Sequence, residues 1–336
     1  MTASVGPSGG APLSGFPIPA PVRAVLEASG IRSLYPPQAS ALKPLFEGRN
    51  LVLACPTASG KSLVAYLALL RAALSGGTGL YLVPLRALAQ EKFEELERFS
   101  GLGLRIGLSI GDFDLSSEAL EKIDILVATS EKADGLLRRG APWLQRLGCV
   151  VADEVHLLRD PDRGPTLEVS LSRLRVDRPK LQIVALSATV GNSAVLADWL
   201  GAVHVASDFR PVPLRSGVFH QGEITFTDLG TRRIAGPGEP VARLVRSVIE
   251  EGGQALVFVN TRKASDQVAE SLVPVVRPLL SVAERTAARA ASEELGAAGE
   301  EETEGIRRLG ALLPSGVAYH NASLTYGERR VIERAF

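Results

Sequence analysis

The stretch "NLVLACPTASGKSLVAYLALL", residues 50–70, decides the fold of this chain. An apolar run predicts a buried strand, a phosphate-binding loop (P-loop) pattern follows it, and an apolar helical pattern begins directly afterwards. In such a loop, backbone N–H groups and the N-terminus of the following helix bind anionic oxygens. One departure is Cys55, which stands where such loops usually begin with Gly or Ala. The stretch predicts a nucleotide-binding α/β domain.

Further apolar runs alternate with amphipathic helical patterns up to about residue 205, which predicts a mainly parallel, doubly wound sheet. The expected strands are "GLYLVP" (79–84), "IDILVAT" (123–129), "GCVVAD" (148–153) and "LQIVALSAT" (181–189). A second, weaker alternation of strand and helix patterns follows the Pro-punctuated segment 209–215. It includes two expected strands, "QALVFVN" (254–260) and "GVAYH" (316–320).

Composition limits the classes of protein that fit. A length of 336 residues suggests two domains. The 37 Lys and Arg residues balance 37 Asp and Glu, which counts against a passive nucleic-acid coat but not against a motor with a narrow groove. Two cysteines cannot form a disulfide framework, so a cytoplasmic protein is expected. The longest apolar run, 63–70, is too short to span a bilayer, so no membrane partner is expected.

The P-loop assigns roles to its own residues. Lys61 would contact the β- and γ-phosphates of ATP, and the Ser62 hydroxyl would hold Mg²⁺. Cys55 leaves two readings open: a thiol activated by the helix N-terminus and Lys61, or a buried, inert thiol. The expected ATP-binding residues of the loop are Thr57, Ala58, Ser59, Gly60, Lys61 and Ser62.

A second motif, "VVADEVH" (150–156), places two acidic residues at the carboxyl end of a buried strand, where open α/β sheets bind ligands. Asp153 suits Mg²⁺ held partly through water, and Glu154 suits orienting and deprotonating the attacking water. A helix cap is the structural alternative for an acid pair. The acid pair lies on the same predicted sheet edge as the P-loop. This position favours an ATP site with Lys61, Asp153 and Glu154 as catalytic residues.

With both motifs in place, the chain resembles the superfamily 2 helicases, and among them the Ski2-like, DEVH-box group, most of all its archaeal DNA-repair helicases. The resemblance runs from about Phe16 to Phe336 in consistent order. "YPPQ" (35–38) resembles the Q motif, with Gln38 reading adenine. The other matching stretches are "VPLRALAQEK" (83–92), "GDFD" (111–114), "TSEKADGLLR" (129–138), "DPDRGPTLE" (160–168), "SAT" (187–189) and "LVFVNTR" (256–262).

The resemblance implies further site residues. Nucleic-acid contacts are expected at Arg86, Thr129, Asn260, Thr261 and Arg262. Coupling of the ATP site to the nucleic-acid face is expected at His156, Ser187, Ala188 and Thr189. Structural alternatives remain for several of them: a solvated helix arginine for Arg86, a core histidine for His156, and a helix N-cap for Ser187 and Thr189.

The resemblance also implies two RecA-like domains with mainly parallel, doubly wound sheets. We expect a flexible lead-in at 1–20, an ATP-binding domain at 21–212 and a second domain at 213–336. The chain stops inside a helical pattern, before the family's motifs V and VI, so the second domain is expected to be incomplete.

The function implied is that of an ATP-dependent helicase, an ATP hydrolase that translocates on single-stranded or forked DNA and unwinds it 3′ to 5′ in repair or recombination. A monomer is expected. One alternative is an RNA helicase of the same group, and another is an idle fragment that binds nucleotide. A small-molecule P-loop kinase would explain neither "SAT" nor "LVFVNTR".

Overall fold

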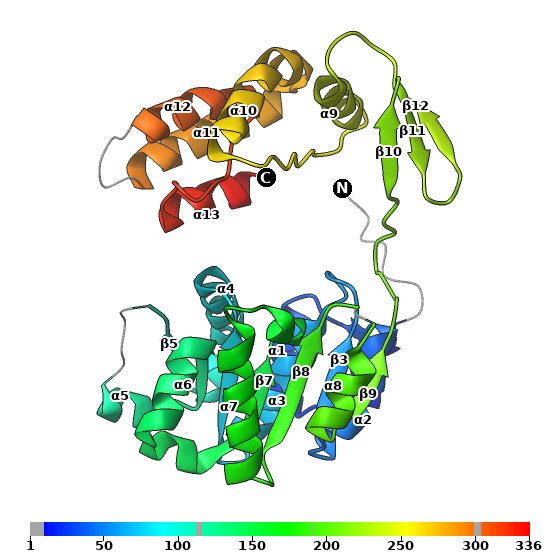
Figure 1. Cartoon of the computed structure of the whole chain (residues 1–336). Coiled ribbons are helices and arrows are strands. Elements are labelled where there is room, and N and C mark those ends of the chain that lie inside the picture. The colour runs from blue at the N-terminus through cyan, green and yellow to red at the C-terminus, as the bar shows by residue number, and fades with distance from the viewer. Residues whose placement is uncertain (1–9, 112–115, 190, 299–303) are drawn as a thin grey trace. The chain divides into compact units, whose positions relative to one another are not determined.

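The computed structural model describes residues 10–111, 116–189, 191–298 and 304–336. The chain divides into two compact units, Met1–Pro213 and Leu214–Phe336, and each is described by itself (Figure 1). Within the described ranges, no helix is both long and apolar enough to cross a bilayer.

A seven-stranded sheet forms the centre of the first unit, in the order β5-β6-β4-β7-β8-β3-β9. All of its strand pairs are parallel, so the carboxyl ends of the strands share one edge. This confirms the predicted α/β fold, a RecA-like core. The strands are β3 (Leu51–Ala54), β4 (Thr78–Val83), β5 (Ile106–Ser109), β6 (Ile125–Thr129), β7 (Leu147–Ala152), β8 (Gln182–Ser187) and β9 (Val203–Ala206).

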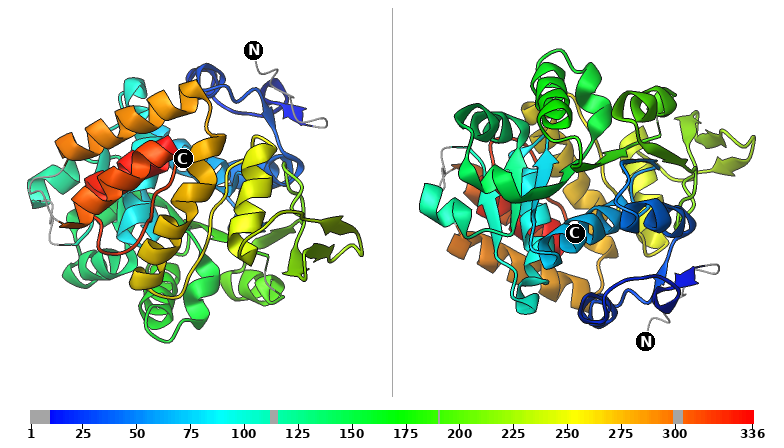
Figure 2. Two further views of the ribbon diagram at one scale, coloured as in Figure 1. Left: turned by 90° about the horizontal axis from the view of Figure 1, so that it is seen from above. Right: turned by 90° about the horizontal axis from the view of Figure 1, so that it is seen from below.

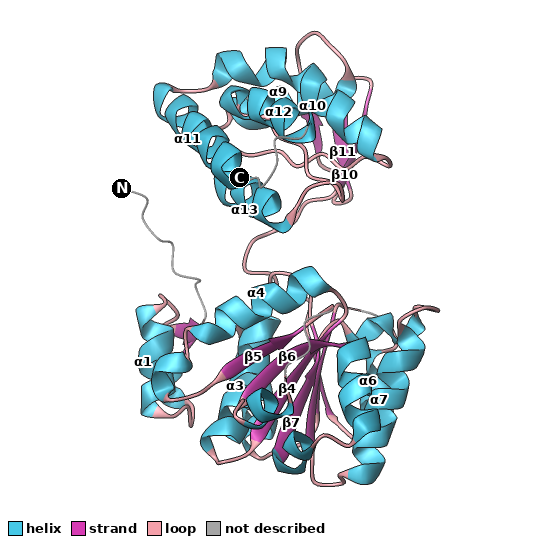
Figure 3. Cartoon of the chain, turned by 90° about the vertical axis from the view of Figure 1, so that its left-hand side faces the viewer, coloured by secondary structure: helices cyan, strands magenta, loops and turns pink. Residues whose placement is uncertain are grey.

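Helices cover both faces of this sheet, with α3 and α4 on one side and α6 and α7 on the other (Figure 3). Successive side chains of a strand point to opposite faces, so Leu51 and Leu53 enter the core around α3, while Val52 enters the core around α7. The helices are α1 (Ala20–Ala28), α2 (Pro36–Phe46), α3 (Lys61–Leu74), α4 (Arg86–Glu97), α5 (Ser117–Glu121), α6 (Ser130–Arg139), α7 (Gly164–Asp177) and α8 (Ser193–Leu200).

The expected lead-in at 1–20 needs a correction for its second half, since residues 1–9 lie outside the described part. Strand β1 (Ala11–Pro12) pairs with β2 (Ser33–Leu34), and the side chains of Leu13 and Ile18 are buried in the core around α3. Burying these apolar side chains ties residues 10–20 to the first unit.

The second unit combines a small antiparallel sheet with a group of helices. The sheet contains β10 (Gly217–His220), β11 (Glu223–Phe226) and β12 (Thr231–Arg233). It stands beside α9 (Pro240–Glu250), where the Arg232 guanidinium donates to Ser247 Oγ over 3.0 Å (Figure 1). The remaining helices are α10 (Arg262–Val276), α11 (Val282–Ala298), α12 (Glu304–Leu312) and α13 (Tyr326–Ala335), of which α11 and α13 lie side by side (Figure 2).

The two strands expected in this unit, at 254–260 and 316–320, are not formed, and these two predictions are wrong. Residues 254–260 do carry a strand-like alternation of exposure. Leu256 and Phe258 are 66% and 87% exposed, whereas Ala255 and Val257 pack partly against the helical core. A strand needs a neighbour to complete its hydrogen-bond ladder, and no described residue pairs with either segment.

Candidate functional site

The predicted site residues of the first unit converge where three neighbouring strands end. Strand β8 lies between β7 and β3, and Ser187 at its end is directly beside Ala54 of β3. The P-loop therefore leaves β3 on one side of Ser187, and the acid pair leaves β7 on the other. The sheet thus brings the P-loop, the acid pair and "SAT" together.

The P-loop, residues 55–62, is shaped by left-handed backbone. Gly60 has φ 74° and Ala58 has φ 62°, a region that costs free energy for a residue with a side chain. The Ser59 hydroxyl donates to the carbonyl of Pro56 over 2.7 Å. Gly60 is the N-cap of α3, and no side chain of the described chain caps this helix end. The Leu63 N–H donates to the Gly60 carbonyl over 3.2 Å, and the lack of a side-chain cap leaves the N–H groups before it to a ligand or water.

Lys61 is buried at the start of α3, and its ammonium donates to the carbonyl of Cys55 over 2.8 Å. Burial lowers the pKa of Lys61, while the Glu154 and Asp153 carboxylates oppose that shift. The cation is thus held inside the loop, within the electrostatic influence of the acid pair.

Gln38 ties the segment before α2 to the P-loop. Its side-chain oxygen accepts from the Tyr35 N–H and its side-chain nitrogen donates to the Gly60 carbonyl, each over 2.8 Å. One N–H and one acceptor site of the amide remain, which is the pair that an adenine edge requires. The Tyr35 ring packs on Phe209, with 5.3 Å between the ring centroids.

Asp153 is buried at the end of β7, with a donor on each carboxylate oxygen. The Tyr81 hydroxyl donates to Oδ2 over 2.8 Å, and the Glu154 N–H donates to Oδ1 over 2.9 Å. Burial raises the pKa of Asp153, and the Tyr81 hydrogen bond works against that rise. Glu154 has φ 48°, again the left-handed region.

His156 lies between the acid pair and "SAT". Its Nδ1 is 3.3 Å from Glu154 Oε2 and 3.5 Å from the Ala188 N–H donor. The nitrogen can donate a proton to the carboxylate or accept from Ala188, but one nitrogen cannot do both at once. The Ser187 hydroxyl is buried without a partner among the described residues, and Thr189 is exposed. The N-cap of α8 is Asn192, so neither Ser187 nor Thr189 caps that helix.

The donor set at this edge fits Mg²⁺. That ion prefers oxygen ligands, keeps several of its waters and binds through one or two protein groups plus phosphates. Asp153 supplies a carboxylate fixed at both oxygens, and Ser62 supplies a hydroxyl in the first turn of α3.

Two of the expected nucleic-acid contacts lie farther along the same sheet edge. Thr129 ends β6 beside Val83 of β4, and Arg86 is the first residue of α4. The exposed Arg86 guanidinium packs against Gly111, where an added Cβ would lie 2.9 Å from Nη1. Thr129 is buried, so its hydroxyl is poorly placed to contact a phosphate. The first N–H groups of α6 have no side-chain cap from Thr129 and suit that contact better. The rest of "GDFD", residues 112–114, lies outside the described residues.

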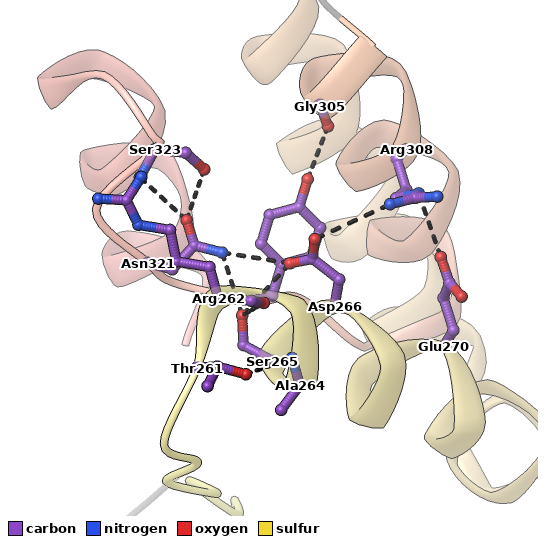
Figure 4. Close-up of polar contacts among 11 residues, drawn as sticks. Thr261, Arg262, Ala264, Ser265, Asp266, Glu270, Gly305, Arg308, Asn321 and Ser323 are labelled. Atoms are coloured by element: carbon purple, nitrogen blue, oxygen red, sulfur yellow. Dashed lines mark hydrogen bonds and ion pairs between the residues drawn. The ribbon is translucent and has the colours of Figure 1, made fainter.

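The other expected nucleic-acid contacts lie at the start of α10 in the second unit, where Figure 4 shows Thr261 and Arg262. Asn260, Thr261 and Arg262 are exposed, and Thr261 Oγ1 accepts from the Ala264 N–H over 3.1 Å. That hydroxyl therefore serves as a helix cap. Figure 4 also shows a residue without a predicted role, Asn321, whose amide donates to Ser265 Oγ over 3.0 Å and joins its loop to α10.

The structure favours the second of the two interpretations of Cys55. The side chain is fully buried, and burial raises the pKa of its thiol despite the nearby Lys61. Burial of this kind is typical of inert thiols, so slow labelling of Cys55 is expected. Tyr81 is the site residue that the sequence reasoning missed; its only signal was a phenol inside the otherwise apolar strand "GLYLVP".

Comparisons with known proteins agree with this geometry. Residues 35–196 match the DEAD/DEAH box helicase family. Over 95% of its length the chain is 45% identical to the ATP-dependent DNA helicase Hel308 of Methanocella arvoryzae, and over 96% it is 47% identical to the protein of that name from Thermococcus kodakarensis. The Pyrobaculum calidifontis Hel308 is 42% identical over 96% of the chain. The chain spans 44%, 28% and 45% of these relatives, less than half of each.

Proposed function

We propose, from the premise that residues 35–196 form a DEAD/DEAH box helicase domain, that this chain is the ATP-binding portion of an ATP-dependent DNA helicase. The observation that carries the proposal is the convergence of the P-loop, the acid pair and His156 at one sheet edge. Residues 21–212 would be the ATP-binding RecA-like domain and 213–336 the start of a second one.

The chemistry follows from the residues at that edge. Lys61 would exchange the Cys55 carbonyl for the β- and γ-phosphates, a charge-assisted contact. Asp153 and Ser62 would hold Mg²⁺, which when bound neutralises charge on the phosphate oxygens. Glu154 Oε2 would take the proton of the attacking water.

The hydrogen bond made by His156 Nδ1 would depend on the state of the Glu154 carboxylate. With Nδ1 deprotonated it can accept from Ala188, and with Nδ1 protonated it can pair with Glu154. A change at the catalytic carboxylate would thus alter the hydrogen bond to Ala188, which supports a coupling role for His156 and Ala188. The same role for Ser187 and Thr189 is proposed from the resemblance alone.

The nucleic-acid partner in this proposal is single-stranded or forked DNA. The three relatives named above are all called DNA helicases. Arg86 and the start of α6 would contact phosphates, which position a strand without reading its sequence. Asn260, Thr261 and Arg262 would contact it from the second unit. Movement 3′ to 5′, a role in repair, a monomeric state and a cytoplasmic location belong to the same proposal.

ATP binding is the property to test on this chain. Calorimetric titration with Mg-ATP is expected to show binding that weakens at least about a hundredfold in Lys61→Ala, since a buried charge-assisted contact is removed. The exposed Lys180 supplies the control, Lys180→Ala, which should bind as the wild type does. Equal affinities for Lys61→Ala and wild type would overturn the site.

The remaining roles can be tested separately. Glu154→Gln should retain ATP binding while removing hydrolysis in the longer protein. Competition between DNA and RNA single strands of one sequence tests the partner, and stronger binding of RNA would favour the RNA helicase alternative.

A further inference from the structure

Two tyrosines are buried beneath the candidate site, between α3 and the sheet. Tyr81 lies in β4 and Tyr66 in α3, and their ring centroids are 6.0 Å apart. Both are essentially inaccessible to solvent, and their neighbours in the core are mostly aliphatic. A buried hydroxyl costs free energy unless it finds a hydrogen-bond partner, so each phenol needs one.

The two phenols use different partners. Tyr81 donates to Asp153 Oδ2 over 2.8 Å, whereas Tyr66 donates to Glu95 on α4. Each also lies within hydrogen-bonding reach of Ser62. The bond to Asp153 therefore distinguishes Tyr81 from an otherwise similar neighbour.

The bond to Asp153 restricts that carboxylate. With Tyr81 on Oδ2 and the Glu154 N–H on Oδ1, rotation about the Cβ–Cγ bond would break a hydrogen bond at each oxygen. Burial raises the pKa of the Tyr81 phenol well above its ordinary value, so the group stays a neutral donor. Partners of this kind fix the orientation of ligating carboxylates in metal sites.

We propose that Tyr81 is a positioning residue for the magnesium-bound nucleotide, because its hydroxyl fixes the Asp153 carboxylate in the orientation that receives the ion. The inference rests on the proposed role of Asp153. The hydroxyl, not the ring, carries this role, since a phenylalanine would fill the same space in the apolar core.

Matched variants test the proposal. ATP affinity is measured by titration calorimetry over a series of Mg²⁺ concentrations and in excess chelator, for wild type, Tyr81→Phe and Tyr66→Phe. Tyr81→Phe is expected to raise the Mg²⁺ concentration for half-maximal effect about tenfold, the lower end for loss of such a partner. Its affinity for metal-free ATP should be unchanged. Tyr66→Phe should raise the Mg²⁺ requirement clearly less than Tyr81→Phe does, since both tyrosines reach Ser62 but only Tyr81 is bonded to Asp153.

A general loss of stability cannot imitate this result, because metal-free affinity is measured on the same protein. The double variant gives a second criterion: in an Asp153→Asn background, Tyr81→Phe should change the Mg²⁺ requirement no further. Additive effects, or equal Mg²⁺ requirements for Tyr81→Phe and Tyr66→Phe, would overturn the positioning role and leave ATP binding intact. A wild type that binds no ATP would instead overturn the proposed function, and the inference with it.

Discussion

The segment that enters α3 and the segment that enters α10 share a design: an apolar run, a short loop and a helix. In the first unit, β3 is paired on both sides, by β8 and β9, and Leu51 to Ala54 are all buried. In the second unit, residues 254–260 pack on one face only, and Leu256 and Phe258 remain exposed. An apolar run of this length is compatible with a strand, but neighbouring strands decide whether one forms.

The two helix starts differ in the same sense. The N-cap of α3 is Gly60, which has no side chain to accept from the first N–H groups of the helix. The N-cap of α10 is Thr261, whose hydroxyl accepts from Ala264. A helix whose N-cap side chain accepts from one of its first N–H groups has fewer of them left to bind an anion. The comparison therefore favours α3 as the phosphate-binding helix.

Thiol reactivity should give the largest contrast between the two segments. Cys55 follows β3 and is buried, whereas Phe258→Cys would introduce a thiol at a position that is 87% exposed. The introduced thiol should react with a chromogenic disulfide reagent roughly a thousandfold faster than Cys55, because Cys55 becomes accessible only when the fold opens locally. Cys149 should also be slow, because burial raises its pKa to about 12. Rapid labelling of Cys55 would restore the activated-thiol reading.

Leucine truncation should be the next largest effect. Leu53→Ala removes a side chain that is 1% exposed and should lower the unfolding free energy of the first unit by about 2–5 kcal/mol. Leu256→Ala, at a position that is 66% exposed, should cost the second unit less than about 1 kcal/mol. Hydrogen exchange read by mass spectrometry reports each unit separately. A cost at Leu256 as large as at Leu53 would mean that 254–260 is covered in solution.

Ligand should stabilise one unit and not the other. Mg-ATP at a hundred times its dissociation constant should add about 2.7 kcal/mol to the stability of the first unit. Both tryptophans, Trp143 and Trp199, belong to that unit, so their fluorescence during denaturation reports it. Lys61→Ala should remove the gain. No gain in the wild type, or an equal gain in Lys61→Ala, would mean that the start of α3 does not bind the nucleotide.

The smallest expected effect concerns the cap of α10. Thr261→Ala should lower the stability of the second unit by about 1 kcal/mol, and Thr261→Ser should retain most of it, because a serine hydroxyl can accept the same N–H. Hydrogen exchange of residues 262–266 measures the change. Equal exchange in Thr261→Ala and wild type would show that the cap contributes nothing in solution.

The strands that could be predicted are those buried on both faces. The runs that became β3, β4, β6, β7 and β8 are almost wholly apolar, as central parallel strands require. The edge strands β5 and β9 were missed because each has a neighbour on one side only. Alternate residues of β5 and all residues of β9 are at least partly exposed, so their sequences lack a continuous apolar run.

The antiparallel sheet of the second unit was also missed, although it carries a signal. Gln221 and Gly222 join β10 to β11 with φ of 47° and 87°, the geometry of a tight two-residue hairpin. Gly at the second position suits that turn, but Gln at the first is unusual there, so the pattern is weak.

Much of the candidate site could be predicted because parallel strands deliver their carboxyl ends to one edge. Tyr81 could not, since its bond to Asp153 depends on β4 lying beside β7 and on both side chains facing α3. A sequence gives the face of a residue only relative to its own strand. Which strand lies next to it is a property of the whole sheet.

At Glu154, selection for stability and selection for catalysis favour different residues. Its left-handed backbone favours glycine or asparagine, and either would relieve strain of roughly 1 kcal/mol. Neither could take a proton from water. A library screened only for heat resistance should therefore enrich Glu154→Gly and Glu154→Asn, whereas a screen for turnover in the longer protein should retain the glutamate. The residue frequencies at this one position would then report which of the two properties a population of sequences had been selected for.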